Sequence, residues 1–348
     1  MNILQVGLGN FGKRHLEAWH RLGLGERLFI AERDPSKWAE TERFRVPKER
    51  LVTDPTECLN RVDLVDIVTP TDTHFALCKA ALAAGKDVFV EKPMTMSSAE
   101  ARQLVELAQR HKRFIQVGYY YRYHPISQYL KAQLAAGRFG PIRYVTGNFY
   151  GFKRARTDVG VTQADGIHFL DLFNWFLGGS PVEVYAVCRD HFGRGLEDFS
   201  ILLLTYPDGS VGKVESGYVQ PGRWKDKVVP GALTTKDIGL VGERASAEVD
   251  FETETLTIYD ARHELRNGIW TAVVGDAVQP PIEPCDPVQM VSRELSAFLN
   301  AVEARQPPSA GPVESGVTLA ALIEAIYESA ARHEPVRIET PAYAGASR

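Results

Sequence analysis

Lys92 is one of two candidate side chains in this sequence for chemistry on a hydroxyl group. It lies in Glu91-Lys92-Pro93, directly after an apolar run over residues 87–91 that predicts a buried strand. An ammonium at a strand end can stabilise a developing alkoxide and, where water is excluded, can exchange a proton. The alternative is a surface lysine at a strand end, and these residues alone leave the choice open.

His168 is the second candidate, in the segment Asp165-Gly-Ile-His168. The spacing of apolar residues predicts a helix over residues 166–177, with the histidine near its start. A histidine there can present its ring to a cleft, and imidazole titrates close to neutral pH, which suits a general base. The alternative is a histidine whose ring is satisfied inside the core.

A glycine pattern at the beginning of the chain could hold a dinucleotide. Residues 1–6 form an apolar run that predicts a buried parallel strand, and Gly7-Leu-Gly9-Asn10-Phe11-Gly12 follows at once. Gly7 would allow the tight turn, Gly9 would let a pyrophosphate approach the backbone, and Gly12 would let the next helix pack closely. The positive end of that helix would then face the phosphates. The alternative is a glycine turn in some other strand–helix–strand unit.

Glu32 and Arg33 bear on which dinucleotide binds. Residues 28–31 form a second apolar run, and Glu32 ends it 20 residues after Gly12, where an acid that binds ribose hydroxyls is expected. A carboxylate there would repel a 2′-phosphate, which favours NAD over NADP. Arg33 could lie on the adenine, reach toward a 2′-phosphate or stay in solvent, so NADP is not excluded.

The elements that must position these residues alternate between strand and helix up to about residue 120. Further strands are predicted over 64–68, 87–91 and 114–118, and helices over 13–22, 75–84 and 99–112. Strands separated by helices predict an α/β domain of the Rossmann type, with a doubly wound parallel sheet. Ser97 or Ser98 would cap the last of these helices.

The pattern changes after about residue 120. Strands are predicted over 142–150, 182–188, 199–206, 211–218, 238–242 and 247–259, with helices over 125–136, 166–177, 287–304 and 315–333. Successive strands joined by short turns, such as Pro207-Asp-Gly-Ser210, predict an α+β domain with a large, mostly antiparallel, open-faced sheet. A second subunit would cover the open face, which predicts a homodimer or homotetramer.

A chain of 348 residues is long for one core, so two domains are expected. We predict a dinucleotide-binding domain over 1–120, a substrate-binding and oligomerisation domain over 121–335, and a C-terminal strand or tail over 336–348. The formal net charge of −4 gives no electrostatic reason to expect a nucleic acid or a membrane as partner. Four scattered cysteines, with no signal peptide and no apolar stretch of membrane-spanning length, favour a cytoplasmic protein without a metal site.

Several motifs are spread over nearly the whole chain. They are Gly7 to Gly12 with His15, Thr69-Pro70 with His74, Glu91-Lys92-Pro93, Gly118 to Pro125, Gly166-Ile-His168 with Asp171, and Glu324 to Ala330. With these motifs the chain closely resembles the Gfo/Idh/MocA family, the relatives of glucose–fructose oxidoreductase and inositol dehydrogenase. The resemblance is specific for the family, not for a substrate.

The resemblance implies a nicotinamide dinucleotide in the first domain and a sugar or cyclitol against the sheet of the second. Lys92 matches the family's catalytic lysine, and His168 matches its catalytic histidine. The cofactor-binding residues then expected are Gly7, Gly9, Asn10, Phe11, Gly12, Glu32, Arg33, Thr69, Pro70, Thr71, His74, Glu91, Lys92 and Pro93.

One position departs from the family pattern. Relatives often carry an aspartate four residues before the histidine, one helical turn away on the same face. Here that position is Ala164, and the acid is Asp165, three residues before His168. Either Asp165 takes over the catalytic role through a shifted helix start, or the usual acid partner is missing.

Positive residues after the strand 142–150 bear on the substrate. If they converge on a cleft they would bind a carboxylate or phosphate, which favours a uronate or a nucleotide-linked sugar. A solvated basic loop or a subunit contact is the alternative. A tyrosine of the Gly118 to Pro125 motif would stack on the sugar ring. The substrate-binding residues expected are Tyr121, Arg122, Lys153, Arg154, Arg156, Asp165 and His168.

The sequence therefore predicts an NAD-dependent oxidoreductase that transfers hydride between nicotinamide and a secondary hydroxyl of a sugar or sugar derivative. His168 would take the hydroxyl proton and Lys92 would stabilise the alkoxide, or the two roles would be exchanged. The alternative is a glycosidase or lyase that oxidises its sugar transiently with tightly held NAD. A non-catalytic sensor of sugar or NAD is a third, less favoured, interpretation.

Overall fold

The computed structural model describes residues 1–339, which form two compact units. The first unit comprises residues 1–123 and 286–320, and the second comprises residues 124–285 and 321–339. Residues 286–320, which the sequence assigned to the second domain, therefore pack with the first unit. Helix α7 (Pro287–Glu303) accounts for this difference, because its apolar stripe is buried in the core of that unit.

After residue 320 the chain passes from the first unit back to the second. Helix α8 (Val313–Arg332) begins in the first unit and continues in the second. Of the predicted terminal segment 336–348, strand β16 (Val336–Arg337) is formed, and residues 340–348 lie outside the described residues. No helix within residues 1–339 combines the length and the apolar character that a membrane crossing requires.

The first unit is built on a parallel sheet in which six strands are described, in the order β3-β2-β1-β4-β5-β6. The predicted α/β class with a doubly wound sheet is confirmed. The short edge strand β3 escaped prediction, because it has only two residues. The strands are β1 (Ile3–Val6), β2 (Leu28–Ala31), β3 (Leu51–Val52), β4 (Leu64–Ile67), β5 (Asp87–Glu91) and β6 (Ile115–Gly118).

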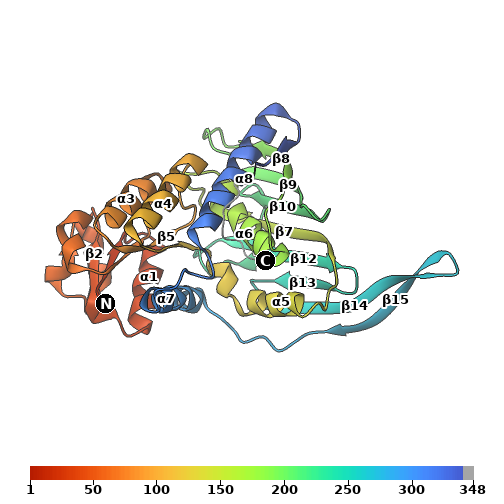
Figure 1. The fold of residues 1–348 in the computed structure, drawn as a ribbon, viewed down its shortest axis with the longest axis horizontal. Helices are drawn as coiled ribbons and strands as arrows, with labels where there is room; N and C mark the ends of the chain where they lie inside the picture. Colours follow the sequence, from red (N-terminus) through yellow and green to blue (C-terminus); the bar gives the residue numbers. More distant parts are fainter. Residues whose placement is uncertain (340–348) are drawn as a thin grey trace. The chain divides into compact units, whose positions relative to one another are not determined.

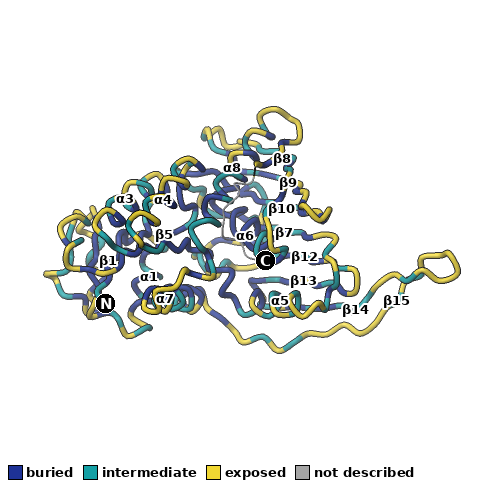
Figure 2. The backbone as a smooth tube through the Cα atoms, in the orientation of Figure 1, coloured by how far each residue is buried: buried dark blue, intermediate teal, exposed yellow. Residues whose placement is uncertain are grey.

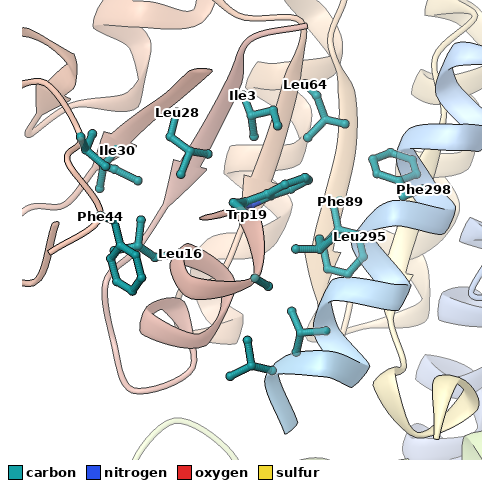
Figure 3. Packing of buried hydrophobic residues seen from close by; sticks show 14 of the residues in the cluster. Ile3, Leu16, Trp19, Leu28, Ile30, Phe44, Leu64, Phe89, Leu295 and Phe298 are labelled. Carbon is teal, nitrogen blue, oxygen red and sulfur yellow. The ribbon is translucent and has the colours of Figure 1, made fainter. Parts of the chain in front are cut away.

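Helices cover both faces of this sheet (Figure 1). α1 (Gly12–Arg21) and α7 lie on one face, and α3 (His74–Ala83) and α4 (Ser98–His111) lie on the other. Figure 3 shows the apolar cluster between α1, α7 and the strands, with Trp19, Phe89 and Phe298 fully buried in it. The predicted cap of α4 is present, since the Ser97 hydroxyl accepts a hydrogen bond from the Glu100 backbone N–H at 3.2 Å.

The second unit is built on one large sheet with the order β15-β14-β13-β12-β7-β10-β9-β8-β16, and β11 pairs with β12. All described neighbours are antiparallel except β7 and β10, so the predicted mostly antiparallel sheet is confirmed. The strands are β7 (Ile142–Phe152), β8 (Glu183–Arg189), β9 (Phe199–Thr205), β10 (Val211–Gly217), β11 (Trp224–Lys225), β12 (Leu233–Gly242), β13 (Ser246–Asp250), β14 (Thr255–Arg266) and β15 (Ile269–Val278).

Several features of this sheet differ from the predicted strands: β11 was not predicted, and β12 begins at Leu233 instead of residue 238. The predicted strand 247–259 is two strands, because the Asp250 carboxylate accepts hydrogen bonds from the backbone N–H groups of Glu252 and Thr253 and closes a turn. Strand β15 was not predicted at all. Its side chains are mostly exposed, so no alternation of apolar and polar residues marks it in the sequence.

Helices α5 (Pro125–Ala135) and α6 (Ile167–Leu177) complete this unit. Gly147 of β7 lets α6 approach the sheet, since a Cβ there would lie 2.7 Å from the ring of Phe169. The opposite face carries exposed apolar side chains, and the strand register places Tyr144 directly opposite both Val211 and Val241. This face of the sheet is the open face that the sequence predicted.

The hairpin of β14 and β15 forms an arm that extends beyond the neighbouring strands (Figure 1). Figure 2 shows that most of its outer part is exposed. Apolar side chains are among the exposed ones: Leu265 is 60%, Ile269 69%, Trp270 65% and Val274 81% exposed. Exposed apolar side chains in this number are typical of a surface that meets a partner.

Candidate active site

The glycine turn after β1 leaves room for a ligand at one position only. Gly7 has a φ of +103°, and a Cβ there would lie 2.4 Å from the Val68 carbonyl oxygen. A Cβ at Gly12 would lie 2.4 Å from the carbonyl oxygen of Gly7. A Cβ at Gly9, in contrast, would meet no described atom within 4 Å. The turn therefore closes on itself at two glycines and is open at the third, as a dinucleotide pyrophosphate requires.

The carboxylate of Glu32 is held at the end of β2. It accepts hydrogen bonds from the backbone N–H of Leu8 at 2.7 Å and of Asp34 at 3.1 Å, and Lys37 lies 3.1 Å away. Burial works to raise the pKa of Glu32, but these donors hold it below its usual range. An ionised carboxylate in this position suits ribose hydroxyls. Arg33, beside it, is exposed.

The other predicted residues of the first unit follow neighbouring strands at the same edge of the sheet. Thr69, Pro70 and Thr71 follow β4, and Glu91-Lys92-Pro93 ends β5 with a cis peptide bond before the proline. Tyr121 and Arg122 lie in a 3-10 turn after β6, and both are buried. The residues expected to hold the dinucleotide thus meet along one edge, outside the carboxyl ends of the parallel strands.

The predicted residues of the second unit cluster around one aromatic ring. The Lys153 ammonium lies 2.8 Å from Asp165 Oδ1 and 4.8 Å from the centre of the Phe149 ring. The imidazole of His168 stacks on the same ring, with the centroids 5.7 Å apart. Asp165 Oδ2 is buried and has no hydrogen-bond partner among the described residues. A carboxylate oxygen in that state can accept a hydrogen bond from a substrate hydroxyl.

The helix that carries His168 starts earlier and less regularly than predicted. A π-helical turn over Thr162–Gly166 precedes α6, with Asp165 in it. The Glu197 carboxylate accepts a hydrogen bond from the backbone N–H of Thr162 at 3.0 Å and from the Tyr327 hydroxyl at 2.9 Å. A π turn inserts extra backbone into a helix and changes which side chains share a face. It offers the shifted helix start that a role for Asp165 requires.

The basic residues of the segment 153–156 do not form a cluster of unpaired cations. Lys153 is paired with Asp165, with both side chains 8% exposed, and Arg156 is paired with Asp158. Arg154 is exposed and has no ion-pair partner among residues 1–339. The positive charge of this segment is thus largely neutralised by the chain itself.

A pocket of about 620 Å³ opens where β7, β8 and β10 end. Two of its phenylalanines present half of their surface to solvent: Phe152 is 52% and Phe192 53% exposed. Lys153, which pairs with Asp165, also lines it, so the pocket adjoins the His168 cluster. The lining residues are Phe152, Lys153, His191, Phe192, Tyr218 and Val219.

Sequence reasoning missed the aromatic part of this site. Phe149 is at an inward position of a predicted strand, so its burial could have been inferred from alternation, but its contact with His168 could not. Phe152 and Phe192 lie 40 residues apart in the sequence, and nothing local connects them. Among residues 1–339, no group of three or more His, Cys, Asp or Glu side chains is arranged to hold a metal ion.

Comparisons with known proteins agree with this arrangement. Residues 1–119 match the family described as "Oxidoreductase family, NAD-binding Rossmann fold", and residues 127–248 match the "GFO/IDH/MocA C-terminal domain". The chain belongs to the Gfo/Idh/MocA family. The predicted family, the oxidoreductase class and the NAD-binding Rossmann domain are therefore confirmed.

Several of the relatives are named as sugar dehydrogenases. UDP-N-acetylglucosamine 3-dehydrogenase from Acidithiobacillus ferrooxidans is 29% identical over 329 residues, which cover 92% of this chain and 94% of that one. D-xylose 1-dehydrogenase (NADP(+)) 2 from Haloferax volcanii is 26% identical, with 90% of this chain and 92% of that one covered. The solved structure of a levoglucosan dehydrogenase in complex with NADH shares the fold, with a TM-score of 0.82, 20% identity and coverage of 98% and 99%.

Filling the open position of the glycine turn should block the dinucleotide without disturbing the fold. We expect Gly9→Val to weaken NAD binding by roughly tenfold or more, because its side chain takes the space where a pyrophosphate approaches the backbone. The melting temperature should stay within a few degrees. Gly12→Ala is the matched control, since its Cβ meets the Gly7 carbonyl oxygen and should lower stability. Fluorescence titration with NAD and thermal melting check both, and unchanged affinity in Gly9→Val would contradict the assignment.

Removing the charge of Asp165 should expose the cost of burying Lys153. We expect Asp165→Asn to lower the free energy of unfolding by about 3 kcal/mol, because a buried ammonium loses its counter-charge. Glu40→Gln removes a pair of the same kind at the surface, where Lys13 and Glu40 are both 40% exposed. That control should change stability by less than about 1 kcal/mol. Urea unfolding compares the two, and equal effects would show that the Lys153 pair is solvated.

Proposed function

We propose that this protein transfers hydride between a nicotinamide dinucleotide and a secondary hydroxyl of a sugar or sugar derivative. The observation that carries the proposal is the cluster around Phe149, where His168, Lys153 and the half-partnered carboxylate of Asp165 adjoin a pocket. Imidazole and carboxylate groups beside a ring-sized pocket are what deprotonation of a sugar hydroxyl requires. The names of the relatives support the same substrate class.

The proposal gives three residues distinct roles. His168 takes the proton of the hydroxyl that is oxidised, and Lys92 stabilises the alkoxide with its positive charge, or the two exchange these roles. Asp165 accepts a hydrogen bond from a neighbouring hydroxyl through Oδ2 and orients the ring. The nicotinamide, when bound, supplies the hydride acceptor. NAD is the proposed dinucleotide because of Glu32, and NADP stays open because a relative is named for it.

The substrate we propose is a sugar that carries a ring substituent. Because the nearby cations are mostly paired within the chain, charge alone does not select the substrate. The half-exposed rings of Phe152 and Phe192 offer flat apolar surfaces on which a second ring can stack. A nucleotide-linked sugar would use the exposed rings for stacking and Arg154 for its phosphate. A uronate would use Arg154 alone, without the rings.

The experiment that tests this function follows NADH formation over a panel of neutral sugars, cyclitols, uronates and nucleotide-linked sugars. We expect the nucleotide-linked sugars to give the highest kcat/KM. A response confined to small neutral polyols would contradict the proposed substrate. Product formation without net NADH would instead support the glycosidase or lyase interpretation, and cofactor binding without turnover of any compound would support a sensor.

Lys92→Ala should lower kcat by roughly 100-fold or more, because the alkoxide loses its counter-charge, while NAD affinity changes little. The matched control is Lys79→Ala, which removes an exposed lysine of α3 in the same unit and should leave turnover intact. Steady-state kinetics and NAD titration measure both variants. Normal turnover in Lys92→Ala would contradict the proposed mechanism.

We also propose that the chain assembles as a homodimer or homotetramer through the second unit. The support is the open face of its sheet and the exposed apolar residues of the β14–β15 arm. The four cysteines form no disulfide in the structure, which supports a reducing compartment, and we propose the cytoplasm.

Trp270→Lys should lower the assembled mass, because it places a charge on the apolar side of the arm. Thr271→Lys is the control on the same hairpin, because the strand register places Thr271 on the opposite side from Trp270. Light scattering behind size-exclusion chromatography reports the mass. The wild-type mass in Trp270→Lys, or a monomeric wild type, would rule out an interface on the arm.

A further inference from the structure

Two buried histidines contact the segment Glu91-Lys92-Pro93, one at the residue before Lys92 and one at the residue after it. His15 lies in α1 and is 0% exposed, and His74 begins α3 and is 1% exposed. The proposed reaction gives no role to His15. It gives His74 only the expected contact with the dinucleotide.

His15 sits between two carboxylates. Its Nδ1 lies 3.0 Å from Asp66 Oδ2, and its Nε2 lies 3.3 Å from Glu91 Oε1. Trp19 fixes the first carboxylate, since its indole N–H donates to Asp66 Oδ2 at 2.7 Å. Burial works to lower the pKa of His15, but the facing carboxylates of Asp66 and Glu91 raise it to about 10. The ring is therefore a cation at neutral pH, and it draws the Glu91 side chain inward.

The inward position of Glu91 depends on its neighbour in β6. A Cβ at residue 118 would lie 2.4 Å from Glu91 Oε1, so only a glycine leaves space for the carboxylate there. The other oxygen, Oε2, accepts a hydrogen bond from the Lys92 backbone N–H at 3.2 Å. The backbone that enters Lys92 is thereby tied to α1 and β4.

His74 holds the opposite side of Lys92 by hydrogen bonds. Its Nδ1 lies 2.8 Å from the Pro93 carbonyl oxygen, and its Nε2 lies 2.9 Å from the Thr69 carbonyl oxygen. Both oxygens can only accept, and a neutral imidazole has one N–H, so only the imidazolium donates to both. The backbone that leaves Lys92 is thereby tied to the turn after β4.

We infer that His15 and His74 are positioning residues for Lys92, which fasten the residues before and after it to neighbouring strand ends. A lysine side chain has many rotamers, so its ammonium is placed reproducibly only if its backbone does not move. The value of this fastening for turnover rests on the proposed function, whereas the fastening itself does not.

Two variants test the inference. His74→Leu keeps an apolar side chain of similar size and removes both donors, and Glu91→Gln keeps the shape of Glu91 and removes the charge that faces His15. His111→Leu is the control, at the end of α4 in the same unit. Hydrogen–deuterium exchange of peptides that span residues 91–94, kcat, the dissociation constant of NAD and the melting temperature are measured for each.

We expect faster exchange at residues 91–94 in both variants, with kcat, measured at saturating NAD, lower by roughly 10- to 100-fold. His111→Leu should change none of these. Unchanged exchange at residues 91–94 overturns the inference whatever the activity. A loss of kcat that only follows a loss of NAD affinity or of folding overturns it as well, because a merely structural role predicts that result.

The outcome is separable from that of the proposed function. If Lys92→Ala turns over normally, the catalytic role of Lys92 is wrong, and the exchange measurement still decides whether the two histidines fasten the segment. If His74→Leu exchanges faster and turns over normally while Lys92→Ala does not, the positioning role is wrong and the catalytic role stands.

Discussion

The parallel register of β1, β4 and β5 is the constraint on which the first unit depends. Val6 lies beside Ile67, and Ile67 beside Val90, so the three strands end together. The turns that follow them, residues 7–12, 69–74 and 91–93, must then share one edge, although they are far apart in the sequence. The glycines make that edge close-packed, and the buried histidines connect its segments to one another. Dinucleotide binding and placement of Lys92 are consequences of the same strand alignment.

In both units, buried charged side chains lie next to groups of opposite charge, but the residues that form these pairs differ. In the first, the imidazolium of His15 compensates two buried carboxylates. In the second, Lys153 and Asp165 compensate each other beside the ring of Phe149, and Lys236 is buried between Asp226 and Glu252. A buried charge without a counter-charge costs several kcal/mol, so pairs of this kind occur where chemistry needs charged groups away from water. Beside Phe149, the pairing of Lys153 with Asp165 Oδ1 leaves Asp165 Oδ2 able to accept a hydrogen bond from a substrate.

The structure changes the meaning of two patterns that were visible in the sequence. The run Lys153 to Arg156 suggests an anion site when it is taken as a row of charges, but the paired aspartates leave mainly Arg154 exposed. The acid before His168 lies one position away from the family pattern, and the π turn over Thr162–Gly166 accommodates that difference in the backbone. The Lys153 pair and the π turn could not be predicted, because both involve partners contributed by other segments, namely Asp165 and Glu197.

The sequence by itself determined the alternation of elements, the class of each sheet, the glycine turn and the positions of Lys92 and His168 at element ends. These follow from local patterns, namely apolar periodicity, turn residues and motif spacing. Only the tertiary structure decided that residues 286–320 pack with the first unit and that the imidazole of His168 stacks on Phe149. It also decided that His15 contacts Glu91 and His74 contacts Pro93, on either side of Lys92. The physical reason is that ion pairs, ring stacking and helix docking act between groups that are close in space and distant in the chain, whereas sequence patterns report mainly on neighbours.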